Sequence, residues 1–262
     1  MFKMASCDGC QLQLLDAEEA LLELAGAIEI SNFAEASSAI EPGPYDVTLV
    51  EGSISTPEQV EQIRAIRAES RFLITIGACA TSGGIQALRN GHDVGAVVRT
   101  VYPTPAYVDT LATSTPIADH VDVDLELTGC PVDRGQLLAT LAWLLQGAVT
   151  PQDATPVCIE CKRRGYVCVV VAHGEPCLGP VTRTGCGALC PGVGRGCYGC
   201  FGPSQPPNTG ALVRRFRELG MSPRRVADTF RFITGYAPAF REVAERIERE
   251  ERGAGEREGA AT

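Results

Sequence analysis

The chain has 262 residues, of which 45% are hydrophobic and 21% charged, and it contains 12 Cys, 28 Gly and 17 Pro. This composition suffices for one or two domains with a hydrophobic core and excludes a disordered or fibrous protein. The longest uncharged apolar run, residues 137–149, is shorter than the roughly 20 residues that span a bilayer, and the N-terminus lacks the apolar core of a signal peptide. We therefore expect a cytoplasmic protein without a membrane partner.

The net charge of −9 is unevenly distributed. Residues 1–150 carry seven basic and 20 acidic side chains, whereas residues 151–240 carry 11 basic and five acidic ones. An acidic chain is a poor general nucleic-acid binder, so we predict no nucleic-acid partner. The basic middle segment still requires a local reason, either a polyanionic partner or an anionic group held inside the protein.

Residues 1–150 show alternating strand and helix patterns. The predicted elements are a helix over 11–25, strands over 27–31, 45–50 and 72–76, a helix that Thr56 and Pro57 open, a strand over 121–127, and a helix that Asp133 caps and Gly147 ends. Such alternation implies right-handed crossovers. We predict an α/β domain with an open, flavodoxin-like parallel sheet over residues 1–150.

Residues 151–262 are predicted to form an irregular Cys-rich domain with short helices. Between residues 156 and 210, 18 residues are Gly or Pro and only 11 are Ile, Leu, Val or Phe. This is little apolar mass to offset the ordering of so much irregular backbone, so we expect metal centres to stabilise the segment. Helices are predicted at 211–219, 222–234 and 241–252, followed by ten frayed residues.

The 12 cysteines are predicted to bind metal, because a reducing compartment does not maintain disulfides. Cys7 and Cys10 directly precede the first helix, and Cys79 and Cys130 each follow a predicted strand. The carboxyl ends of parallel strands lie along one edge of a sheet, so these four thiols are expected to meet there and hold one metal centre. The alternative is four unrelated buried thiols.

The other eight cysteines divide into two sets, each with one Cys-x2-Cys pair. The sets are Cys158, Cys161, Cys168 and Cys177, and then Cys186, Cys190, Cys197 and Cys200. Two four-thiolate sites are therefore expected. The spacing alone does not decide between zinc and iron-sulfur, because both accept such pairs.

Three features of the sequence favour iron-sulfur clusters. The first ligand set is spread over distant segments, unlike a locally closed zinc knuckle. Glycines and prolines flank nearly every Cys, which lets backbone N–H groups approach the sulfurs. Clusters with four thiolates are anionic, and basic side chains stand beside these ligands, namely Lys162, Arg163, Arg164, Arg183 and Arg195. A solvated face or a nucleic-acid patch is the alternative for the basic run at 162–164.

Four motifs resemble the small, electron-transferring subunit of nickel-iron hydrogenases. They are CDGCQLQLL from Cys7, VEG at Val50–Gly52, IGACAxxGG at Ile76–Gly84, and TGCPVD at Thr128–Asp133. The later run PCLGPVTRTGCGALCP…GCYGC is similar to the cytosolic multimeric branch, including NAD(P)-linked and sulfhydrogenase types. The resemblance covers the chain to about Phe201.

The resemblance implies three 4Fe-4S clusters, with catalytic nickel chemistry confined to the large subunit. The proximal cluster would be held by Cys7, Cys10, Cys79 and Cys130, the medial one by Cys186, Cys190, Cys197 and Cys200, and the distal one by Cys158, Cys161, Cys168 and Cys177. The implied function is relay of electrons from the hydrogen-splitting large subunit to diaphorase-type subunits that bind FAD and NAD(P). No side chain here is implied in acid-base catalysis, and no further cofactor site is expected.

Some positions depart from the family pattern. Cys158 stands where exported members carry His, and the medial set has four thiols where many relatives have three. The family has a strand before its CxGC motif, yet only six residues precede Cys7. We expect either a true start upstream of Met1 or a sheet that lacks this edge.

Two other functions are weighed. One is the cluster-bearing subunit of a quinone-linked or membrane-bound oxidoreductase, which usually lacks the eight later cysteines. The other is a zinc-stabilised interaction module without redox function. We expect Glu51 to be an interface carboxylate or a proton relay, and His92, His120 and His173 to be surface or hydrogen-bonded residues rather than ligands.

Overall fold

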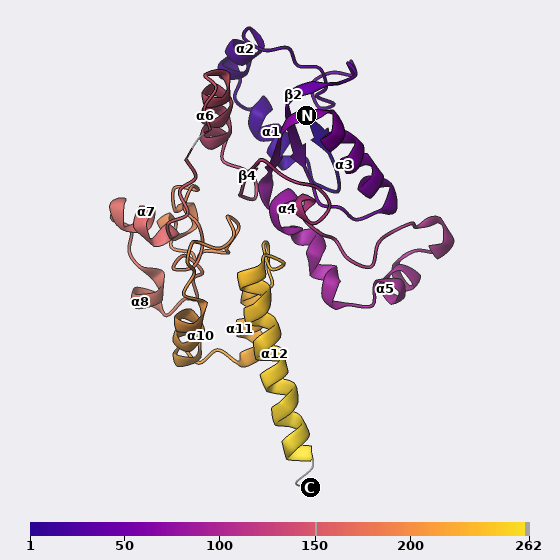
Figure 1. The fold of residues 1–262 in the computed structure, drawn as a ribbon. Helices are drawn as coiled ribbons and strands as arrows, with labels where there is room; N and C mark the ends of the chain where they lie inside the picture. The colour runs from indigo at the N-terminus through magenta and orange to yellow at the C-terminus, as the bar shows by residue number, and fades with distance from the viewer. Residues whose placement is uncertain (150, 260–262) are drawn as a thin grey trace. The chain divides into compact units, whose positions relative to one another are not determined.

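The computed structural model describes the backbone of residues 1–149 and 151–259 and the side chains through residue 253, apart from residue 150. The chain divides into two compact units, residues 1–152 and 153–262. Figure 1 shows the sheet of the first unit and the helices of the second.

The first unit contains a parallel sheet of four strands in the order β1-β2-β3-β4. The strands are β1 (Phe2–Lys3), β2 (Tyr45–Glu51), β3 (Ser70–Ile76) and β4 (Leu125–Leu127). Each neighbouring pair is parallel, with Thr48 opposite Leu73 and Ile76 opposite Leu127. The predicted α/β class with an open parallel sheet is confirmed.

Helices cover both faces of this sheet (Figure 1). On one face, Leu49 and Ile74 pack into a core with α1 (Gly9–Leu15) and α6 (Arg134–Leu145). On the other, Val50 and Leu73 pack with α3 (Pro57–Glu69) and with α4 (Gly77–Ser82). Neighbouring residues of a strand point to opposite faces, so buried strands become apolar on both sides. This core holds the strand ends, and therefore the loops after them, in fixed positions.

Both predicted helix caps are confirmed. The Thr56 side chain accepts the N–H of Gln59, whose own side chain accepts the Thr56 N–H, which completes a capping box. The Asp133 carboxylate accepts the N–H of Gln136 at the start of α6. These signals are local, because a cap satisfies the first free N–H groups of the helix that follows it.

Three predicted elements of this unit are wrong in extent or kind. The helix over 11–25 is two helices, α1 and α2 (Glu19–Ala25), because Glu18 has φ 47° and Arg134 donates to the Asp16 carbonyl at the end of α1. The run 27–31 is not a strand. The predicted strand over 121–127 is shorter and forms only β4. The Asp124 carboxylate accepts the N–H of Leu73, which a backbone carbonyl of a longer β4 would otherwise accept.

Several short elements after β3 were not predicted. They are α4, the 3-10 helix η1 (Ile85–Gly91), α5 (Val94–Val101), η2 (Pro105–Tyr107) and η3 (Ile117–Asp119). Of the two alternatives for the start of the chain, a sheet that lacks its first edge is wrong, since Phe2 and Lys3 form β1 beside Val50 and Glu51, and a start upstream of Met1 stays a prediction.

The helices of the second unit are short, except for the last. They are α7 (Val157–Arg163), α8 (Val169–His173), α9 (Leu189–Gly192), α10 (Thr209–Glu218), α11 (Pro223–Phe230) and α12 (Pro238–Gly259). Helix α11 ends four residues before the predicted 234, and α12 is longer than predicted. The expected frayed end is wrong as far as Gly259, and residues 260–262 lie outside the described residues.

The second unit has an apolar core of its own. Phe216, Phe230 and Phe240 come from α10, α11 and α12, and Leu178 and Val181 come from the Cys-rich segment. The C-terminal helices therefore supply apolar mass that the Cys-rich segment lacks by itself, a contribution the sequence interpretation underestimated. Among the described helices, none is both long and apolar enough to cross a membrane.

Candidate metal centres

The thiols of Cys7, Cys10, Cys79 and Cys130 gather at the carboxyl edge of the sheet. Cys7 and Cys10 lie at the start of α1, Cys79 lies in α4 directly after β3, and Cys130 follows β4. The Cys10 thiol is close enough to Cys79 and Cys130 for their charges to interact, and Cys79 interacts in the same way with Cys7. The four thiols, which come from three segments, thus lie near one another at this edge, although no three of them are close enough to ligate a single metal ion.

Glycines make room for these sulfurs. A Cβ at Gly77 would lie 2.2 Å from the Cys10 sulfur, and a Cβ at Gly84 would lie 2.6 Å from the Cys79 sulfur. Both glycines also have positive φ, of +83° and +61°, where other residues are strained. The site therefore requires glycine at these two positions for two independent reasons.

Burial keeps the thiols of Cys10, Cys79 and Cys130 protonated when no cation is present. It raises the pKa of Cys10 well above its ordinary value, despite the N–H that Val132 donates to the sulfur at 3.5 Å. Burial likewise raises the pKa of Cys79 to about 11 and raises that of Cys130. A metal bound here must displace protons and supply the positive charge that stabilises thiolates.

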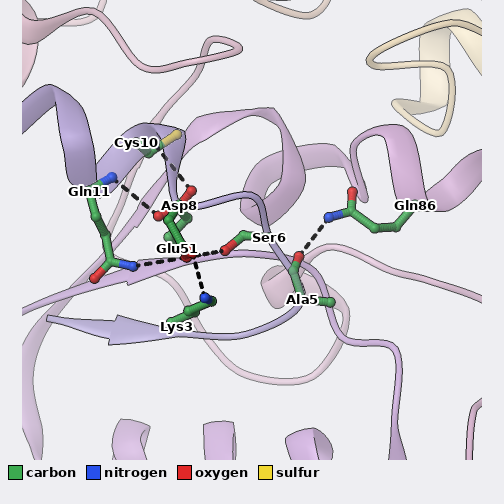
Figure 2. A network of polar contacts seen from close by, with 8 residues as sticks. All are labelled: Lys3, Ala5, Ser6, Asp8, Cys10, Gln11, Glu51 and Gln86. Carbon is green, nitrogen blue, oxygen red and sulfur yellow. Dashed lines mark hydrogen bonds and ion pairs between the residues drawn. The ribbon is translucent and has the colours of Figure 1, made fainter. Parts of the chain in front are cut away.

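A buried carboxylate holds the start of α1. Glu51, only 2% exposed, accepts the N–H of Cys10 at 3.2 Å through Oε1 and the N–H of Gln11 at 3.2 Å through Oε2 (Figure 2). Burial raises the pKa of Glu51, while the two N–H donors oppose that rise. The last residue of β2 therefore fixes the backbone of a thiol residue 41 positions away.

A second polar residue, Gln86, joins two of the thiol loops. Its side chain donates to the Ala5 carbonyl at 2.8 Å, two residues before Cys7 (Figure 2). A hydrogen bond with Gln86 also opposes the rise of the Cys79 pKa. Lys3 and Asp8 close the same loop by an ion pair of 2.6 Å. The sequence interpretation missed Gln86, because nothing in its local pattern indicates a contact with residue 5.

In the second unit, Cys158, Cys161, Cys168 and Cys177 form another group. Cys158 interacts electrostatically with all three others, and burial raises its pKa to about 11. Cys177 is buried and accepts N–H groups from Cys197 at 3.2 Å and from Gly179 at 3.4 Å. N–H donors aimed at a sulfur favour its anionic form.

The last four cysteines are less tightly grouped. Cys197 interacts with Cys200 and accepts the Gly199 N–H at 3.4 Å. Cys186 interacts with Glu160, and Cys190 interacts with Cys177. This set therefore adjoins the preceding one through Cys177, and the division of eight thiols into two sets stays a prediction.

All 12 cysteines are free thiols. Among the described residues, no three His, Cys, Asp or Glu side chains converge closely enough to ligate one metal ion. His120 hydrogen-bonds Thr115 at 2.7 Å, and His92 and His173 are exposed, so these residues are hydrogen-bonded or on the surface, as expected.

Known proteins resemble this chain along most of its length. Residues 7–144 match the family model described as the NADH ubiquinone oxidoreductase, 20 Kd subunit. The sulfhydrogenase 2 subunit delta of Pyrococcus furiosus is 37% identical over 84% of this chain and 92% of its own length.

Solved structures agree with this match. A chain of an NAD+-reducing [NiFe]-hydrogenase in the H2-reduced state superposes with a TM-score of 0.53 and 31% identity, covering 56% of this chain and 89% of that one. A [NiFeSe]-hydrogenase chain from Dm. baculatum, 17% identical, shares the fold over 78% of this chain and 94% of its own, with a TM-score of 0.51.

The fold and thiol groups define an iron-sulfur subunit of an oxidoreductase. The chain belongs, more narrowly, to the small, electron-transferring subunits of nickel-iron hydrogenases, within the family of the 20 Kd subunit. A large subunit is the partner that such membership implies.

Proposed function

We propose that this chain conducts electrons through three 4Fe-4S clusters between the hydrogen-splitting large subunit and an electron acceptor. The observation that carries the proposal is the meeting of Cys7, Cys10, Cys79 and Cys130 at one sheet edge. Their sulfurs come from loops that a rigid core positions, and two glycines leave space beside them. These four would hold the proximal cluster.

The remaining eight thiols would hold the other two clusters. Cys158, Cys161, Cys168 and Cys177 are assigned to the distal cluster, and Cys186, Cys190, Cys197 and Cys200 to the medial one. The N–H bonds to Cys177 and Cys197 support ligation, since such donors stabilise thiolates and raise the potential of a cluster. The contact of Cys197 with Cys177 supports two neighbouring centres in this unit.

Each bound cluster would accept one electron and pass it on without making or breaking covalent bonds. This chain's residues fix the spacing of the clusters, exclude water around them and stabilise their negative charge. The exposed basic residues of the Cys-rich segment support the last role. No side chain of this subunit is assigned to acid-base catalysis.

We propose a diaphorase-type acceptor that binds FAD and NAD(P), in a cytoplasmic complex. The relatives named as a sulfhydrogenase subunit and as a chain of an NAD+-reducing hydrogenase support this choice. The match to the 20 Kd subunit family keeps a quinone-linked oxidoreductase as the second candidate. The eight cysteines after residue 150 count against it.

The experiment is Cys79→Ala in the complete complex. We expect the large subunit to keep exchanging hydrogen isotopes, because its own site is untouched, while reduction of the acceptor collapses. Ser82→Ala, in the same helix, removes a hydroxyl that donates to the Ala78 carbonyl; it is the control and should retain acceptor reduction. Intact acceptor reduction in Cys79→Ala would refute the proximal assignment.

A further inference from the structure

The second unit exposes apolar side chains around its thiols. Val167, Val171, Leu189 and Val193 are 64%, 81%, 68% and 67% exposed. Single exposed apolar residues are ordinary, but a group of them within one short segment typically marks a contact surface. They come from the α7–α8 link, from α8, from α9 and from the residue that follows α9.

Direct contacts join the link before α8, which carries Val167, to the α9 segment, and Val171 lies four residues after Val167 in α8. A Cβ at Gly192 in α9 would lie 2.8 Å from the ring of Tyr166, and a Cβ at Gly187 would lie 3.0 Å from the Arg164 guanidinium. The link after α7 therefore packs on the loop and helix that carry Leu189 and Val193. We call Val167, Val171, Leu189 and Val193 the apolar patch.

Unpaired positive charge accompanies the apolar patch. Lys162, Arg163 and Arg195 are exposed, and within the described part of the chain none of them forms an ion pair. Exposed cations beside an apolar centre are complementary to a partner with an acidic rim. The acidic balance of residues 1–150 shows that this is a local feature and not the character of the whole chain.

One thiol of the second unit is exposed beside the apolar patch. It is Cys168, which directly follows Val167, whereas Cys177 and Cys197 are buried and the other five thiols of this unit are partly exposed. Electron transfer weakens steeply with distance. Cys168 therefore marks where a cluster of this unit would come nearest to the surface.

We infer that the apolar patch and its basic neighbours bind the electron-accepting subunit, a protein with an acidic rim around an apolar centre and with an iron-sulfur or flavin group near that rim. The inference rests on the proposed relay function. One electron leaves a reduced cluster of this chain and reduces the acceptor's group, and no bond forms or breaks. A nucleic acid would match the charge but would leave the four apolar side chains exposed.

The test uses the complete complex purified through a tag on the large subunit. Val171→Glu/Val193→Glu places two negative charges on the apolar patch, and Arg214→Glu in α10 gives the same change of net charge at an exposed position outside it. Val171→Ser/Val193→Ser removes apolar area without adding charge. The readouts are retention of the co-purifying acceptor subunits between about 0.05 and 0.5 M salt and hydrogen-dependent reduction of benzyl viologen.

In the glutamate variant, we expect the amount of co-purified acceptor subunits to fall at least tenfold below wild type. The serine variant should release these subunits at lower salt than wild type does. Arg214→Glu should behave as wild type. Benzyl viologen reduction should stay within twofold of wild type in all three. Retention equal to wild type in the glutamate variant would overturn the inference, as would loss of the large subunit in place of the acceptor. A wild-type complex without iron-sulfur signals or dye reduction would instead refute the proposed relay, and this inference with it.

Discussion

The two units position their thiols by different means. In the first, the strand ends of a sheet with a core on both faces carry Cys79 and Cys130, and Glu51 and Gln86 tie the Cys7–Cys10 loop to that frame. In the second, the thiols lie on helices of four to seven residues and on turns, and buried Cys177 and Cys197 belong to the apolar core. Helices this short are not stable alone.

The comparison indicates that metal binding contributes differently to the stability of each unit. The sheet of the first unit has an apolar core on each face, to which Cys10 contributes while Cys7 and Cys130 are exposed. We expect the Cys-rich segment of the second unit to depend on metal binding by its thiols for much of its local order. We expect metal binding to order the Cys-rich segment of the second unit. In the first unit, we expect metal to bind at a site that is already ordered without it.

The largest expected effect is that of metal removal. In the metal-free chain, amides of residues 158–200 should exchange hydrogen faster by roughly 100-fold or more, because their short helices lose the cross-links between them. Amides of β2 and β3 should change by less than about tenfold. Mass-spectrometric hydrogen exchange measures both, and equal deprotection of the two regions would contradict the comparison.

The next effect concerns space beside the first site. Gly77→Ala places a Cβ 2.2 Å from the Cys10 sulfur, whereas Gly147→Ala, also at positive φ (+72°), meets nothing within 4 Å. The control should cost only the left-handed backbone strain, about 1 to 2 kcal/mol. Gly77→Ala should cost more and lower the iron content of the first site. The measurements are the free energy of unfolding and the iron content of both variants. Similar values for the two variants would show that the Cys10 sulfur does not need this space.

A smaller effect is expected at Glu51. Glu51→Ala leaves the N–H groups of Cys10 and Gln11 buried without acceptors, at about 1 to 3 kcal/mol for each. Glu51→Gln keeps an acceptor for one of them and should lie between alanine and wild type. The electron paramagnetic resonance signal of the first cluster should broaden in Glu51→Ala. An unchanged unfolding free energy and an unchanged signal would remove Glu51 as a positioning residue.

The smallest effect tests how α11 is joined to α12. Two hydrogen bonds of 2.7 Å from Arg231 hold the pKa of Glu248 below its ordinary 4.5. A lowered pKa stabilises the fold at pH values above 4.5, and that stability is lost as pH falls through the folded value. Because both side chains are about one-third exposed, Glu248→Gln should cost under about 1 kcal/mol.

The free energy of unfolding, measured at pH 7 and near pH 3, gives the contribution of the Arg231–Glu248 ion pair. The difference between wild type and Glu248→Gln should shrink at the lower pH. Glu250→Gln, whose ion pair with Arg217 is about half exposed, should have less effect. A difference that does not depend on pH would contradict an ionic origin.

The sequence predicts the parts of the fold that depend on neighbouring residues. The caps at Thr56 and Asp133 and the convergence of Cys79 and Cys130 follow from local patterns and from the geometry of parallel strands. The break at Glu18 and the short β4 depend on Arg134 and Asp124, whose partners are remote in the chain. Such side-chain bonds leave no periodic signal.

The candidate sites show the same division. The ligand residue types are visible in the sequence, whereas Gln86 and the two bonds of Glu51 need the folded chain. The core of the second unit also forms only when the C-terminal helices pack on residues 178 and 181, so a composition count over residues 156–210 underestimates it.

The most direct test of the relay is the metal content of the purified complex, counted per copy of this chain after subtraction of the partners' metal. Three 4Fe-4S clusters require about 12 iron atoms and as many acid-labile sulfides. About three zinc ions without sulfide would contradict the relay and leave a zinc-stabilised interaction module.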